Sequence, residues 1–144
     1  MKMHHVGYFV KNIEKSKKKY EELGFRVSER VGNQEIQDDY NRNIRILFME
    51  NGLDDCMIEL VQLLDPSKPS PLDFILKGGA GNYSNCIPYH ICYEVDDIDK
   101  AAEELRKKHY MIINDKEETT EVLFHKNVMF LFNKSAGIIE LIER

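Results

Sequence analysis

The stretch HHVGYFV at residues 4–10 returns as YHICYEV at residues 89–95, and MIELVQ at residues 57–62 returns as IIELIE at residues 138–143. One copy of each pair lies in each half of the chain, in the same order. Similar units of this length each need the other to bury a hydrophobic face. We therefore predict two packed modules with one cleft between their sheets.

Each half combines one helical pattern with several strand-like runs. In the first half Asn12 is a candidate N-cap for a helix that Gly24 ends, and in the second half Asp96 or Asp97 caps the corresponding helix. The predicted helices cover residues 13–25 and 98–110. Strand-like runs follow at 26–31, 43–50 and 56–64, with turns at 32–43 and 51–55, and then at 111–113, 122–127, 128–133 and 138–144. Both halves have the pattern βαβββ, which predicts an α+β fold.

The length of 144 residues corresponds to one domain. We divide it into module one (1–64), a linker (65–87) and module two (88–144). The linker region is rich in proline, contains the glycine cluster at 78–81, and has one apolar helical turn at 72–76.

Composition excludes several classes of protein. The net charge of −5 argues against binding to duplex nucleic acid, which requires cationic side chains. No apolar run is long enough to span a bilayer, and the N-terminus lacks a signal-peptide core. Cys56, Cys86 and Cys92 form neither a disulfide framework nor a CxxC motif. We therefore expect a globular cytoplasmic protein that binds neither nucleic acid nor membrane.

Two histidines and two glutamates occupy equivalent places in the repeat. His5 and His90 lie in the first strand of each half, whereas Glu59 and Glu140 lie in the last, at separations of 54 (from 5 to 59) and 50 (from 90 to 140). Both glutamates have apolar neighbours, and a buried carboxylate must protonate, pair with a cation or bind a metal. These four residues therefore predict a site for one divalent ion, with Ni, Co, Zn, Mn and Fe all compatible with the ligand set.

The alternative for any one of these residues is structural. A single strand histidine is more often packed and hydrogen-bonded than ligated, and a single strand glutamate often faces solvent. The coincidence of four equivalent positions favours the metal site. We expect His4 to point to the opposite face of the strand as a structural residue, and His109 and His125 to lie on the surface.

The doubled βαβββ pattern, together with the stretches at 4–25, 89–108 and 137–143, resembles the vicinal oxygen chelate superfamily, which includes glyoxalase I (lactoylglutathione lyase) and methylmalonyl-CoA epimerase. The resemblance implies U-shaped mixed sheets around a cleft and commonly a homodimer. It also implies one metal held by His5, Glu59, His90 and Glu140. In glyoxalase-like chemistry Glu59 or Glu140 is both ligand and base, and a proton moves next to a carbonyl through a metal-bound enediolate.

The sequence departs from both enzymes at the substrate pocket. Bacterial glyoxalase I has a glutathione-binding arginine where this chain has Phe9, and an asparagine where it has Leu63. The arginines that could substitute are Arg26, Arg30, Arg42 and Arg45. The middle loop is more similar to the epimerase, whose catalytic glutamate corresponds to Arg45 here.

Arg45 has two interpretations. It either points into the cleft and binds a carboxylate or phosphate of the substrate, or pairs with an acidic neighbour on an exposed face. Strand alternation alone does not choose between them.

Our leading prediction is a metal-dependent, homodimeric, glyoxalase-like enzyme that acts on a small carbonyl compound. The alternatives are a methylmalonyl-CoA epimerase-like enzyme acting on a thioester and a non-catalytic small-molecule binding or resistance protein. The metal site separates the enzymes from the binding protein, since a binding protein has no need of buried histidines and glutamates.

Overall fold

The computed structural model describes residues 1–76 and 85–144. The first half contains β1 (Lys2–Val10), α1 (Ile13–Glu22), β2 (Arg26–Val27), β3 (Gln37–Asp39), β4 (Ile44–Glu50) and β5 (Met57–Leu63). The short helix α2 (Asp73–Leu76) precedes the second half. That half contains β6 (Cys86–Val95), α3 (Ile98–Lys107), β7 (Met111–Ile112), β8 (Glu117–Glu118), the 3₁₀ helix η2 (Glu121–Leu123), β9 (Asn127–Asn133) and β10 (Gly137–Glu143).

The described strands form one mixed sheet with the order β2-β4-β5-β1-β6-β10-β9-β7, and β3 and β8 pair with β4 and β9. The order is symmetric about its centre, where β1 and β6 run antiparallel. On either side of this pair, β5 is parallel to β1 and β10 is parallel to β6. The structure confirms the predicted α+β fold, and it shows that the two halves share a continuous sheet through β1 and β6.

Side-chain caps begin both long helices at equivalent places. The Asn12 side chain accepts a hydrogen bond from the Lys15 amide at 3.0 Å, and Asp97 accepts one from Lys100 at 2.9 Å. Asp97, not Asp96, is therefore the cap of α3. Gly24 has a φ of 90° just beyond the end of α1, a conformation that glycine adopts without steric cost.

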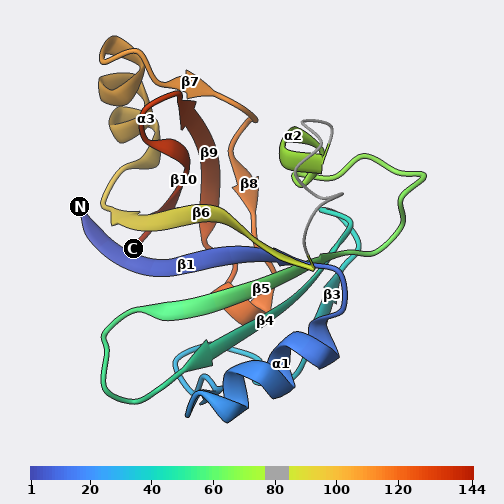
Figure 1. Cartoon of the computed structure of the whole chain (residues 1–144). Helices are drawn as coiled ribbons and strands as arrows, with labels where there is room; N and C mark the ends of the chain where they lie inside the picture. Colours follow the sequence, from blue (N-terminus) through green and yellow to red (C-terminus); the bar gives the residue numbers. More distant parts are fainter. Residues whose placement is uncertain (77–84) are drawn as a thin grey trace.

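The two long helices, α1 and α3, cover the outer faces of the sheet, and the inner faces of the two halves pack against each other (Figure 1). Val10, Ile13 and Leu47 belong to the core between α1 and the first half, while Ile98 and Leu141 belong to the core between α3 and the second. A third, central core joins inward-facing residues of both halves, including Ile46, Phe48, Val61, Val128 and Phe130. Side chains along β4 and β5 alternate between the central core and the core under α1, and this alternation decides which of them reach the centre.

One predicted strand is shorter than expected, and another is wrong. Residues 26–31 contribute only Arg26–Val27 to the sheet, because Ser28 and Arg30 turn toward the carboxylate of Glu50. Residues 122–127 form most of η2 and a tight turn, in which Phe124 and His125 both have a φ of 57°. The predicted turn at 32–43 contains the short strand β3, which is too brief to produce a recognisable alternation.

The glycine cluster at 78–81 lies outside the described residues. Within the described ranges, no helix is long and apolar enough to cross a membrane.

Candidate functional site

Four side chains of types that commonly bind metals meet at the centre of the sheet. The four central strands β1, β5, β6 and β10 supply His5, Glu59, His90 and Glu140 respectively. The two histidine Nε2 atoms are 2.9 Å apart. Glu59 Oε2 lies 3.3 Å and 3.2 Å from the Nε2 atoms of His5 and His90, and Glu140 Oε2 lies 3.0 Å and 3.1 Å from them. The sequence-predicted quartet is thus a geometric cluster.

Strand register explains the convergence. Gly7 of β1 is opposite both Glu59 on β5 and His90 on β6, while Cys92 of β6 is opposite both His5 and Glu140. The four residues therefore form two pairs across the centre of the sheet. Glu59 and His90 flank Gly7, and His5 and Glu140 flank Cys92. All four side chains are buried, with exposed fractions of 0–5%.

Gly7 makes room for His90. A Cβ atom at this position would lie 2.3 Å from His90 Cε1, which is too close for two non-bonded carbon atoms unless the His90 ring moves. A glycine inside a strand often marks such a close approach, so the glycine in the stretch HHVGYFV indicates that another side chain packs against β1 at this point.

The cluster perturbs the protonation of all four groups. Burial alone would lower the pKa of His5, but the carboxylates of Glu59 and Glu140 outweigh it and raise the pKa to about 9. The pKa of His90 is raised for the same reason. Burial opposes ionisation of the carboxyls, yet the two histidines lower the pKa of Glu59 to about 2 and hold that of Glu140 well below its usual range.

These distances fit a single bound cation. Bonds of about 2.0–2.2 Å to zinc place neighbouring donor atoms about 2.9–3.5 Å apart, depending on coordination number. The five donor–donor distances given above span 2.9–3.3 Å. Two imidazole nitrogens and two carboxylate oxygens suit a divalent transition ion. The side chains present can therefore hold the metal that the sequence predicts.

His4 lies against the site, contrary to the expectation that it points away. Its Nδ1 lies 2.7 Å from Nδ1 of His5. A shift of register between Met3 and His5 breaks the regular alternation of β1, which allows neighbouring side chains to meet. Burial and the adjacent His5 lower the pKa of His4 to about 4, so it is neutral at pH 7 and can accept the Nδ1 proton of His5.

Arg45 takes the second of its two interpretations. Its Nε and Nη2 atoms donate to the two oxygens of Asp38 at 2.7 Å and 3.2 Å. Its strand neighbours Ile44 and Ile46 belong to the central core, so Arg45 lies on the other face of β4. The structure therefore favours the ion pair with Asp38 over the alternative contact of Arg45 with substrate.

Of the other arginines, only Arg42 reaches the centre. Arg26 and Arg30 bind Glu50 at a distance from the quartet. Arg42 is 6% exposed and borders the small hollow that also contains Glu59, His90 and Glu140. No pattern in the sequence distinguishes Arg42 from the other arginines, because it lies in a loop just before β4.

This chain is similar to known proteins in sequence and in structure. Residues 4–142 match the family model of the Glyoxalase/Bleomycin resistance protein/Dioxygenase superfamily. The chain belongs to this superfamily. It is also 30% identical to the mitochondrial methylmalonyl-CoA epimerase of Mus musculus over 143 residues, which are 97% of this chain and 71% of that relative.

Solved structures of superfamily members share the fold. Methylmalonyl-CoA epimerase from Mycobacterium tuberculosis superposes with a TM-score of 0.74 at 19% identity, over 98% of this chain and 86% of that one. A Streptomyces coelicolor methylmalonyl-CoA epimerase variant in complex with 2-nitronate-propionyl-CoA gives a TM-score of 0.73 at 15% identity, over 99% and 96%. These low identities establish the architecture only.

Proposed function

We propose that this superfamily member is a metal-dependent isomerase that moves a proton at the carbon next to a thioester carbonyl, as methylmalonyl-CoA epimerases do. The observation that supports it is the similarity to the mouse epimerase across nearly the whole chain, together with four convergent ligand atoms. This is the alternative that the sequence predicted beside the glyoxalase-like enzyme. The comparisons provide no specific support for the glyoxalase activity.

The quartet would hold one divalent ion, with Ni, Co, Zn, Mn and Fe as candidates. When bound, such an ion supplies positive charge that stabilises an oxyanion while the adjacent C–H bond loses its proton. His5 and His90 would each bind through Nε2, the atom that faces the carboxylates. Their burial keeps water away, which strengthens electrostatic interactions at the centre.

Proton transfer requires a group that is ionised before substrate binds. The lowered pKa values of Glu59 and Glu140 keep both carboxyls deprotonated at neutral pH. Among the described residues, Glu59 and Glu140 are the carboxylates that border the small hollow at the centre. We propose that one of them accepts the substrate proton and returns it.

Proton exchange in deuterated water tests the proposal directly. The metal-loaded protein is incubated with methylmalonyl-CoA, and deuterium at the carbon between the two carbonyl groups is followed by mass spectrometry. We expect incorporation that depends on the protein and disappears in Glu140→Gln. Absence of exchange with fully metal-loaded wild type would contradict the epimerase-like activity.

The same preparation also tests the other functions predicted from the sequence. Turnover of the hemithioacetal of methylglyoxal and glutathione would instead favour the glyoxalase-like enzyme. Inactivity on both substrates, combined with tight binding of a small molecule, would favour a binding protein. The homodimer remains a prediction, which analytical ultracentrifugation measures.

A further inference from the structure

A small hollow of about 10 Å³ borders three of the four quartet residues, Glu59, His90 and Glu140. A hollow of this size has room for about one water-sized group. An oxygen atom that joined a cation at the quartet would occupy it. The other side chains that border the hollow therefore decide how such an oxygen is held.

Tyr89 borders the same hollow, and an irregularity in β6 brings it there. Successive side chains of a regular strand point to opposite faces, so the residue before His90 should point away from the quartet. The pairing of β1 with β6 shifts at this point, and no residue of β1 pairs with Tyr89. Such a bulge re-aims a side chain, and Tyr89 joins the central core on the same face as His90.

Two aromatic contacts fix the Tyr89 ring beside the quartet. It meets the His90 ring edge to face, with ring centroids 4.5 Å apart. It also lies nearly parallel to Phe130, with centroids 5.8 Å apart and an interplanar angle of 19°. The ring is therefore held in one position against a residue of the quartet.

The Tyr89 hydroxyl forms no hydrogen bond with any of the described residues, although a buried tyrosine normally finds a partner. Tyr89 is 7% exposed, and within the described ranges its hydroxyl is not one of the fully enclosed atoms that lack a partner. A ligand can therefore reach it. Arg42, which also borders the hollow, is by contrast held by Asp39 through Nε at 2.7 Å. Tyr89 thus offers an accessible donor beside the quartet.

The surroundings of the phenol favour a role as donor. Burial, followed by the carboxylates of Glu140 and Glu59, raises the pKa of Tyr89 well above its ordinary value. A phenol is already protonated at pH 7 at its ordinary pKa of about 10, so its O–H group is available to donate. The two carboxylates that act most strongly on this phenol belong to the quartet, which agrees with its position at the hollow.

We propose that Tyr89 donates a hydrogen bond to the anionic oxygen of a ligand bound at the quartet. Such a bond is strong because its acceptor is charged. In the reaction proposed above, the acceptor is the thioester carbonyl oxygen, which gains negative charge as the neighbouring carbon loses its proton. This catalytic role rests on the proposed function, whereas recognition of an anion by Tyr89 rests on the quartet alone.

Formate binding tests the donor without any reaction. Cobalt-loaded protein is titrated with formate, and the visible spectrum, which changes when an anion joins the ligands of cobalt, gives the dissociation constant. Tyr89→Phe keeps the ring and its contacts but removes the hydroxyl. We expect formate to bind about tenfold more weakly to this variant than to wild type, since hydrogen bonds to charged groups are among the stronger ones.

Tyr93→Phe is the matched control, because Tyr93 lies on the same strand but packs against the core under α3. Its affinity for formate should equal that of wild type. Equal affinities in Tyr89→Phe and wild type, or no formate binding by wild type, would overturn the proposal. Loss of cobalt from Tyr89→Phe, measured by elemental analysis, would assign the hydroxyl a structural role and overturn it as well.

Proton exchange separates the catalytic role from the proposed function. With methylmalonyl-CoA in deuterated water, we expect kcat of metal-loaded Tyr89→Phe to fall about 100-fold, while KM stays within about twofold of wild type. Weaker formate binding in Tyr89→Phe, without any exchange by wild type, would support the hydrogen bond and contradict only the epimerase-like activity. Exchange at equal rates in the two proteins would overturn the catalytic role.

Discussion

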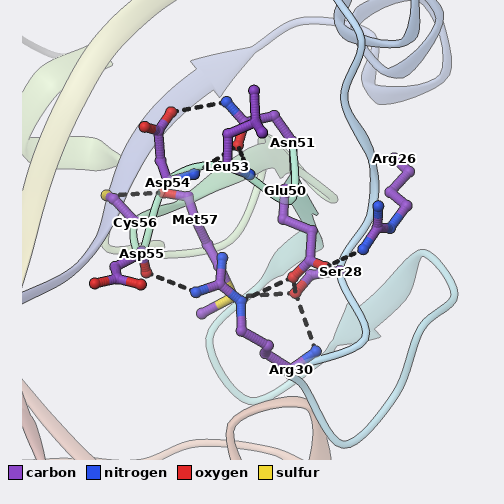
Figure 2. A network of polar contacts seen from close by, with 10 residues as sticks. All are labelled: Arg26, Ser28, Arg30, Glu50, Asn51, Leu53, Asp54, Asp55, Cys56 and Met57. Carbon is purple, nitrogen blue, oxygen red and sulfur yellow. Dashed lines mark hydrogen bonds and ion pairs between the residues drawn. The ribbon is translucent and has the colours of Figure 1, made fainter.

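Glu50 and Glu140 are both buried strand carboxylates, with exposed fractions of 5% and 2%, but their surroundings differ. Glu50 accepts hydrogen bonds from Arg26 at 3.0 Å, Ser28 at 2.7 Å and Arg30 at 2.8 Å (Figure 2). Glu140 instead faces two histidines that are shared with a second carboxylate.

The difference distinguishes a structural carboxylate from a functional one. At Glu50 the chain supplies the cations, so the ion pair is complete within the protein. At the quartet the chain supplies only donor atoms that a cation can share, and the two histidines must be protonated to balance the two carboxylates. Completion by an external ion is the role that fits the quartet.

The largest effect is expected from Glu140→Gln. An uncharged, nearly isosteric side chain removes one of the two anionic ligands, so metal should no longer bind stoichiometrically and exchange should fall by about 10²–10³-fold. Glu143→Gln on the same strand is the control, since Glu143 bonds to Ile98 and Asn127 away from the quartet. Full metal content in Glu140→Gln, measured by elemental analysis, would show that the quartet is not the site.

Glu50→Gln should produce the opposite pattern. The loss of charge-assisted hydrogen bonds to Arg26 and Arg30 should lower the free energy of unfolding by about 2 kcal/mol. The cost stays moderate because both arginines remain partly exposed to water. Metal stoichiometry should stay at the wild-type value. Urea unfolding measures the free energy of unfolding. A loss of metal from the folded variant would contradict the distinction between a structural carboxylate at Glu50 and a metal-binding one at Glu140.

His4→Ala probes the hydrogen bond to His5. Without an acceptor for its Nδ1 proton, His5 is less well oriented, and metal affinity should fall by about tenfold. His125→Ala on the exposed turn should leave affinity unchanged. Competition with a coloured chelator measures both dissociation constants. Equal affinities in the two variants would assign His4 a packing role only.

The pH dependence of stability gives a smaller but specific difference. The hydrogen bond from Ser28, with the arginines Arg30 and Arg26, holds the pKa of Glu50 below its ordinary value of 4.5. The unfolded chain therefore binds this proton at a higher pH than the folded chain does, and stability is lost as the pH falls below about 4.5. Urea unfolding from pH 6 to pH 3 should show a shallower loss in Glu50→Gln than in wild type. Parallel curves would contradict this linkage.

Repetition made the centre predictable from sequence. The equivalent words around His5 and His90, and around Glu59 and Glu140, identified both the strands and the ligand-type residues. Because β1 and β6 are adjacent at the middle of the sheet, equivalent positions on the two halves meet there.

Features without a repeat were not predictable in the same way. The contact between His4 and His5 depends on an irregular register in β1, and Arg42 reaches the centre from a loop. Arg45 was left undecided because alternation does not reveal which face of β4 is inward.

Metal binding by wild type is the most direct test of the central claim. Metal-free protein is titrated calorimetrically at pH 7 with zinc, cobalt, nickel, manganese and ferrous ions, in two buffers of different ionisation enthalpy. We predict one ion per chain for at least one metal, with proton release, because the pKa of His5 in the metal-free site is about 9. Absence of stoichiometric binding by every ion would contradict the assignment of His5, Glu59, His90 and Glu140 as a metal centre.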